Sequence, residues 1–137
     1  MALLENGARQ ILITNRTAEK AEAVAAEFGP IVKAVGWADR NAAMAGTALL
    51  VNCTDRGMIG KPALDVDLAL VAPTTLVADL IYTPLETPFL AEARLRGCVT
   101  VNGLGLLLNQ ARLAFKAWFG VLPDVTPELL KAIEATF

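Results

Sequence analysis

Short apolar runs alternate along the chain with longer stretches in which apolar residues recur at helical spacing. The short runs are rich in β-branched residues and end at polar or turn-forming residues, which is typical of buried strands. The stretches between them are rich in alanine or leucine and end at glycine, as helices commonly do. The pattern predicts strands over residues 11–14, 31–37, 48–54, 76–82 and 98–101, helices over 18–28, 86–96, 106–119 and from 127 onward, and a weak helix or loop over 38–45.

Strands that alternate with helices predict an α/β fold of the Rossmann type, with a mainly parallel sheet and flanking helices. The start of the chain does not fit the usual opening of that fold. Residues 1–6 have the pattern of the second half of a helix that stops at Gly7, whereas the fold normally opens with a strand and a Gly-rich turn. We therefore expect residues 1–137 to form a partial domain, with the first strand and turn missing.

A missing first strand has a consequence for the sheet, because that strand is central in the order 3-2-1-4-5-6. Its loss would expose two strand edges with unpaired backbone groups. We expect the sheet either to close the gap by direct pairing or to pair with another copy of the chain, giving a homo-oligomer.

Composition narrows the classes of function. A chain of 137 residues that is 55% hydrophobic and 19% charged predicts one compact domain. The formal net charge of -2 supplies no basic field, so nucleic acid is not an expected partner. The sequence has no histidine, which excludes imidazole acid–base chemistry and histidine metal ligands, and we expect no metal site.

The apolar segments bear on the cellular location of the protein and on the state of its two cysteines. No apolar stretch approaches the roughly 20 residues of a membrane helix, and the N-terminus has no basic region followed by an apolar one. We therefore expect a cytoplasmic protein without a membrane partner. Cys53 and Cys98 each lie in an apolar run, and we expect two buried free thiols rather than a disulfide.

The segment that follows the first predicted strand carries candidate cofactor-binding residues. Asn15 and Arg16 stand where an NAD-dependent enzyme would favour an acid for the ribose hydroxyls, and Lys20 lies one helical turn later. Two cations suit a doubly charged 2′-phosphate, so the segment favours NADP over NAD. A bound phosphate would also offset the unfavourable helix dipole at Lys20. The alternative is that Thr17 caps the helix while Arg16 and Lys20 are solvated.

Further segments stand in a fixed order along the rest of the chain. They are Asn-Cys-Thr-Asp-Arg-Gly-Met at 52–58, Asp-Leu-Ile-Tyr-Thr-Pro at 79–84, Thr-Pro-Phe-Leu at 87–90, Asn-Gly-Leu-Gly-Leu-Leu-Leu-Asn-Gln at 102–110 and Ala-Phe-x-x-Trp-Phe-Gly at 114–120. With residues 15–20, they make nearly the whole chain resemble the C-terminal portion of the shikimate dehydrogenases. The resemblance implies an oxidoreductase of aromatic amino-acid biosynthesis, in the chorismate pathway, that reversibly reduces 3-dehydroshikimate to shikimate with NADPH.

The resemblance also implies roles for individual residues. Asn15, Arg16, Thr17 and Lys20 would hold the adenosine 2′-phosphate. Thr54 would lie along the cofactor, and Leu80 and Gly103 would flank the nicotinamide, where a glycine permits close approach to a flat ring. Tyr82 and Gln110 would reach the substrate, whose oxygens a phenol and an amide can bind. Without the resemblance, Thr54 could be a loop-initiating hydroxyl, Gly103 a turn glycine and Gln110 a surface residue at the edge of an apolar stripe.

The chain departs from the family at several positions. The family usually has serine where this chain has Asp55, methionine where it has Leu107, and commonly aspartate where it has Asn102. An acid at position 55 is unfavourable near phosphates. The family's catalytic lysine and aspartate lie in an N-terminal substrate domain, which we expect to be absent here together with the Gly-rich turn, so no catalytic residue is assigned in this chain.

Three other functions stay open at this level. A relative that uses quinate or NAD would share most of these segments. Glutamyl-tRNA reductase has a similar Asn-Arg-Thr segment, although residues 79–82 and 103–110 argue against it. A non-catalytic nucleotide-binding or interaction fragment is the third alternative, and it predicts no turnover with shikimate and NADP.

Overall fold

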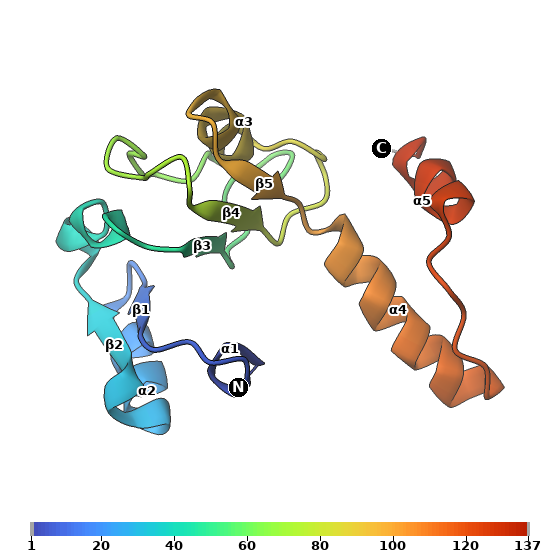
Figure 1. The fold of residues 1–137 in the computed structure, drawn as a ribbon, viewed down its shortest axis with the longest axis horizontal. Helices are drawn as coiled ribbons and strands as arrows, with labels where there is room; N and C mark the ends of the chain where they lie inside the picture. Colours follow the sequence, from blue (N-terminus) through green and yellow to red (C-terminus); the bar gives the residue numbers. More distant parts are fainter. Residues whose placement is uncertain (1, 137) are drawn as a thin grey trace. The chain divides into compact units, whose positions relative to one another are not determined.

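Five short parallel strands and five α-helices make up the part of the chain that the structure, a computed structural model, describes, which is residues 2–136. They belong to two compact units. Unit 1 comprises Met1–Ala45 with Val66–Leu70, and unit 2 comprises Gly46–Asp65 with Val71–Phe137. The two units are coloured along the chain in Figure 1 and are described separately below.

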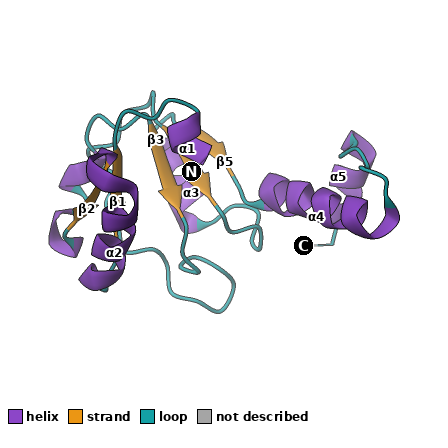
Figure 2. Cartoon of the chain, turned by 90° about the horizontal axis from the view of Figure 1, so that it is seen from below, coloured by secondary structure: helices purple, strands orange, loops and turns teal. Residues whose placement is uncertain are grey.

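Unit 1 contains one parallel strand pair and the helix that connects its strands. Its elements are α1 (Ala2–Glu5), β1 (Ile11–Thr14), α2 (Ala18–Phe28), β2 (Val32–Val35) and the 3-10 turns η1 (Gly29–Ile31), η2 (Trp37–Asp39) and η3 (Ala42–Met44). The alanine-rich α2 packs on both strands, burying Ala21, and Gly29 ends it with a φ of 73°. Figure 2 shows α2 beside the strand pair.

The register between β1 and β2 determines which loops lie at the same edge of the strand pair. Thr14 lies opposite Val35 at the carboxyl ends of β1 and β2. The segments that follow these residues therefore leave the same edge of the strand pair, which is where open parallel sheets bind ligands.

Unit 2 contains a three-stranded parallel sheet in the order β3-β4-β5 and three helices. The elements are β3 (Leu49–Asn52), β4 (Leu76–Asp79), α3 (Pro88–Leu95), β5 (Val99–Val101), α4 (Leu104–Phe119) and α5 (Pro127–Glu134). α3 packs on β4 and β5, as Figure 1 shows. Its Phe89, Leu90 and Ala93 are buried, as is Val77 of β4.

α4 and α5 follow one another at the C-terminal end of unit 2 and share the lining of one groove. Leu108 and Phe115 of α4 line an apolar groove together with Leu129 and Ile133 of α5. The link between the helices is held by Arg112, which donates to the backbone carbonyl of Pro123 and lies 3.4 Å from the Asp124 carboxylate. The opposite face of α4 is solvent-exposed.

The structure confirms the predicted fold class, with parallel sheets flanked by helices. The predicted strand over 31–37 is shorter, because the chain turns into η2 at Trp37. The helix predicted from residue 106 begins at Leu104 instead, where the Asn102 side-chain oxygen accepts from the Leu104 N–H. In the described part of the chain, no helix is long and apolar enough to cross a membrane.

The five strands form two sheets in the described part of the chain, rather than one. The expected order without its first strand leaves strands 3-2 and 4-5-6, and the two observed sheets have this composition. Direct pairing across the gap, one of the two expected solutions, is not seen among residues 2–136. Pairing with another copy stays a prediction.

Candidate functional site

The segment after β1 presents two cations to solvent in unit 1. Arg16 and Lys20 are exposed, on either side of the start of α2. The Asn15 side-chain oxygen accepts from the Thr17 N–H at 2.9 Å, which fixes the turn between strand and helix. Thr17 occupies the N-cap position, but its side chain makes no capping hydrogen bond. The alternative interpretation of this segment thus holds in part: Arg16 and Lys20 are solvent-exposed, but the Thr17 hydroxyl does not cap α2 and gives the first-turn N–H groups no acceptor.

A second feature of unit 1 lies just beyond β2. The Arg40 guanidinium stands 4.5 Å from the centre of the Trp37 ring, and its Nη1 donates to the Trp37 carbonyl at 2.7 Å. Because β1 and β2 are parallel and in register, this pair follows the same strand edge as Asn15 and Arg16. The sequence pattern gave no indication of this stacked pair, since it placed Trp37 in a strand.

The carboxyl ends of β3 and β4 in unit 2 carry buried polar side chains. Asn52 and Asp79 are the last residues of their strands and are paired in register. The Asn52 amide nitrogen donates to Asp79 Oδ1 at 3.0 Å, and the Thr87 hydroxyl donates to Asp79 Oδ2 at 2.7 Å. We call Asn52, Asp79 and Thr87 the polar cluster.

Thr54 is tied to this cluster. Its hydroxyl donates to the Asn52 side-chain oxygen at 2.8 Å and accepts from the Arg56 N–H at 3.1 Å. The hydroxyl therefore organises its own loop, as the alternative interpretation held, although the residue is exposed and its predicted place along a cofactor is untested. The charge of neighbouring Asp55 is partly balanced by Lys61, 3.4 Å away.

Leu80 and Gly103 lie against each other. The Gly103 N–H donates to the Ile81 carbonyl at 2.8 Å, and a β-carbon on Gly103 would stand 2.0 Å from the Leu80 carbonyl oxygen. Gly103 is buried, whereas the Leu80 side chain is 40% exposed. The structure thus gives a different reason for glycine here: the start of α4 packs directly on the backbone after β4.

The two predicted substrate-binding residues lie on different elements of unit 2. Tyr82 is half-buried in the loop between β4 and α3, which contains a cis peptide bond between Thr83 and Pro84. Gln110 is exposed on α4, on the face that also carries the exposed side chains of Leu106 and Leu113. Gln110 is therefore accessible, and its amide is solvated rather than buried in an apolar stripe.

Both cysteines are free, but only Cys98 is buried. The expectation of a buried Cys53 is wrong, because this residue follows the last residue of β3 and lies in the loop. Partial burial of the thiol, and then the nearby Asp79 carboxylate, raise the pKa of Cys53.

Known proteins resemble this chain over almost all of its length. Shikimate dehydrogenase (NADP(+)) from Paracoccus denitrificans is 50% identical over 134 residues, covering 98% of this chain and 48% of that protein. The protein of the same name from Methylobacterium radiotolerans is 51% identical over 135 residues, with the same coverage of 98% and 48%. Over almost its whole length, the chain is thus similar to shikimate dehydrogenases. It spans about half the length of the curated relatives it matches, and corresponds to their C-terminal half. No family model matches it.

Solved structures agree with this similarity. Shikimate 5-dehydrogenase from Thermus thermophilus in complex with NADP(H) and shikimate has a TM-score of 0.79 and 35% identity, over 98% of this chain and 48% of the other. Quinate dehydrogenase from Corynebacterium glutamicum in complex with NAD has a TM-score of 0.86 and 27% identity, over 98% and 49%. The family resemblance stated from the sequence motifs is thus confirmed.

The sequence motifs of the shikimate dehydrogenase family contain the polar cluster without revealing what it does. Asn52, Asp79 and Thr87 are part of the matching segments, but no role was predicted for any of them. A usable signal was present, since Asn52 and Asp79 each end an apolar strand run and neighbouring parallel strands bring such ends together. Thr87 followed by proline is likewise a helix-start signal.

Proposed function

We propose that this chain binds NADP as the cofactor-binding part of a shikimate dehydrogenase, which reversibly reduces 3-dehydroshikimate to shikimate. The observation that carries the proposal is the exposure of Arg16 and Lys20 at the first turn of α2, directly after β1. Two cations and a turn that leaves N–H groups without a side-chain cap form an anion-binding donor set. The names of the relatives support the same cofactor.

In this proposal, residues of unit 1 hold the adenosine 2′-phosphate, with Arg16 as a planar donor and Lys20 as a second charge. In unit 2, Thr54, Leu80 and Gly103 lie along the nicotinamide half. NADPH supplies the hydride when it is bound. Tyr82 and Gln110 contribute hydrogen-bonding groups toward shikimate. We assign no proton-transferring residue to this chain.

A titration tests the cofactor assignment directly. NADPH and NADH are titrated into the wild-type chain and into Arg16→Ala, with binding followed by cofactor fluorescence. Arg16→Ala should weaken NADPH binding about tenfold to a hundredfold, because a hydrogen-bonded charge pair is lost, and should leave NADH binding unchanged. Lys33→Ala is the matched control, since Lys33 is also an exposed cation of unit 1 but lies within β2. Equal affinity of the wild-type chain for both cofactors would contradict the proposal.

A second candidate is a relative that uses quinate and NAD. It is favoured by the likeness to the quinate dehydrogenase determined with NAD. The same titration separates the two, because this candidate predicts tighter binding of NADH and no effect of Arg16→Ala. Assays with shikimate and quinate as alternative substrates then address turnover, which a non-catalytic chain would not show. The expected cytoplasmic location stays a prediction.

A further inference from the structure

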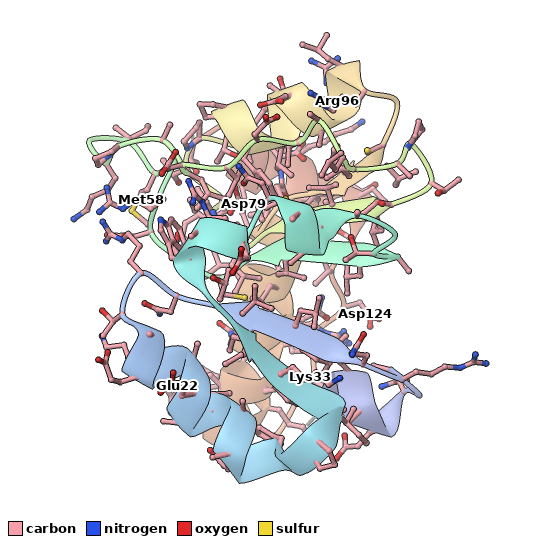
Figure 3. All side chains as sticks on the ribbon, turned by 90° about the vertical axis from the view of Figure 1, so that its left-hand side faces the viewer. Glu22, Lys33, Met58, Asp79, Arg96 and Asp124 are labelled. Atoms are coloured by element: carbon pink, nitrogen blue, oxygen red, sulfur yellow. The ribbon has the colours of Figure 1, made fainter. Side chains whose placement is uncertain are left out.

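The polar cluster contains a buried carboxylate whose hydrogen-bond partners in the described part of the chain are all uncharged. Asp79 is 1% exposed, Asn52 3% and Thr87 0%. Asp79 accepts hydrogen bonds from Asn52, from Thr87 and from the Ile81 N–H at 3.1 Å. A buried carboxylate without a cation is unfavourable unless its oxygens are well satisfied. Figure 3 labels Asp79 at the end of β4.

The cluster joins three segments that are far apart in the sequence. From Asp79 the hydrogen bonds continue through Asn52 to the N–H and hydroxyl of Thr54, at 3.0 and 2.8 Å. In the other direction they continue through the Thr87 hydroxyl, which accepts from the Leu90 N–H at 3.3 Å and so caps α3. The loop after β3, the loop after β4 and the start of α3 are thereby fixed to one carboxylate.

The same carboxylate fixes the backbone around Leu80. Leu80 lies between Asp79 and Ile81 in the sequence. The Ile81 N–H donates to Asp79 Oδ1, and the Leu80 N–H donates to the Asn52 carbonyl at 3.0 Å. The Ile81 carbonyl in turn accepts from Gly103. Displacement of the Asp79 side chain would therefore shift Leu80, Gly103 and Thr54 together.

We propose that Asp79, held by Asn52 and Thr87, is a positioning residue for the nicotinamide half of the dinucleotide. It does not contact the cofactor; it sets the place of Thr54, Leu80 and Gly103, which do. The inference rests on the proposed function, and it concerns unit 2 alone. The adenosine half of the cofactor should not depend on the cluster, because Arg16 and Lys20 belong to unit 1.

Two ligands separate positioning from a merely structural role. NADPH contains both halves of the cofactor, whereas adenosine 2′,5′-bisphosphate contains only the half assigned to unit 1. Thr87→Val keeps the side-chain shape but removes the donor to Asp79 Oδ2, and Thr87→Ser keeps that donor. We expect Thr87→Val to weaken NADPH binding on the order of tenfold while binding of the bisphosphate stays unchanged, and Thr87→Ser to bind both as the wild type does.

Asp79→Asn is the second variant, since an amide of nearly the same shape can retain the contacts at one oxygen. Asp79→Asn should lose less NADPH affinity than Thr87→Val and should keep the affinity for the bisphosphate. Circular dichroism checks that each variant is folded. Equal losses for both ligands in folded variants, or no loss for either, would overturn this inference while the proposed function stands. A wild-type chain that binds neither ligand overturns the proposed function and this inference with it.

Discussion

Gly103 and Gly105 lie two positions apart at the start of α4, yet only the first needs to be glycine. A β-carbon at Gly103 would stand 2.0 Å from the Leu80 carbonyl oxygen, whereas one at Gly105 would meet no atom within 4 Å. Gly103→Ala should therefore lower the free energy of unfolding by about 3 kcal/mol or more, through overpacking against backbone. Gly105→Ala should raise it by about 0.5 kcal/mol, because alanine favours helix. Urea denaturation followed by circular dichroism measures both, and similar values for the two variants would refute this packing.

The Cys53 thiol makes a pH-dependent prediction at the residue scale. Its pKa is raised by burial and then by Asp79, and only the thiolate reacts with iodoacetamide. Alkylation of Cys53 should therefore be slower in the folded than in the unfolded chain near the ordinary thiol pKa, and should accelerate only at higher pH. The raised folded-state pKa also means that this thiol's contribution to stability is lost as the pH rises through it.

Mass spectrometry of alkylated peptides, in a Cys98→Ser background, follows Cys53 alone. Asp79→Asn removes the smaller of the two causes and should lower the pKa, so that alkylation at a given pH becomes faster. A folded chain that alkylates Cys53 as fast as the unfolded one would contradict the assignment.

Sequence reasoning at the residue scale succeeded where position along one element decided the outcome. Arg16 and Lys20 are solvent-exposed at the start of α2, as the alternative interpretation of that segment held, and their binding to a phosphate stays a prediction. It failed where the outcome depends on neighbouring strands. The hydrogen bond between Asn52 and Asp79 requires the register of β3 against β4, and 27 residues separate the two side chains.

At the scale of elements, the predicted order of strands and helices agrees with the structure, and the differences are at the ends. α2 covers the predicted residues 18–28 because an N-cap position and a glycine with positive φ bound it. The strands predicted over 48–54 and 76–82 are shorter, since Asn52 and Asp79 turn their side chains to hydrogen-bond the following loops. Apolar composition continues beyond a strand's last ladder pair, so it cannot locate that pair.

The Thr17 side chain makes no capping hydrogen bond to α2. A better capping residue at this position should therefore have opposite effects on stability and on NADPH binding. Thr17→Asp should stabilise unit 1 by about 0.5–1 kcal/mol, because a carboxylate can accept from the first-turn N–H groups and interacts favourably with the helix dipole. The same charge should repel the 2′-phosphate and weaken NADPH binding. Thr17→Asn is the matched control, since it can cap without charge and should stabilise the unit with a smaller effect on NADPH. If Thr17→Asp leaves NADPH affinity unchanged, the phosphate does not bind at this turn.

At the scale of the whole molecule, the order of the strands agrees with the one predicted from the alternation of strands and helices. Two sheets, β1 with β2 and β3-β4-β5, have the composition expected for the order 3-2-1-4-5-6 without its first strand. The division into two compact units was not predicted, because hydrophobic content reports how much surface is buried and not which strands share a sheet. The strand order follows from the alternation of strands and helices, whereas the boundary between two sheets depends on which strands pair through their backbones.

The unpaired edge of β3 leads to a prediction about self-association of the chain. β3 has one strand neighbour, β4, in the described part of the chain, so its other edge has backbone groups outside any ladder. We expect the chain to self-associate through such an edge, with a weight-average mass in sedimentation equilibrium that rises with concentration. Val51→Lys places a charge at an exposed position of β3 and should shift the chain toward monomer.

The exposed face of α4 is the rival surface for such association, since it carries apolar side chains that α5 does not cover. Leu113, which is 67% exposed, supplies the matched control, because Leu113→Lys adds the same charge there. Association that persists in Leu113→Lys and is lost in Val51→Lys assigns it to the strand edge, and the reverse assigns it to the helix. A wild-type chain that stays monomeric at every concentration would refute self-association, and the β3 edge would then be satisfied by water.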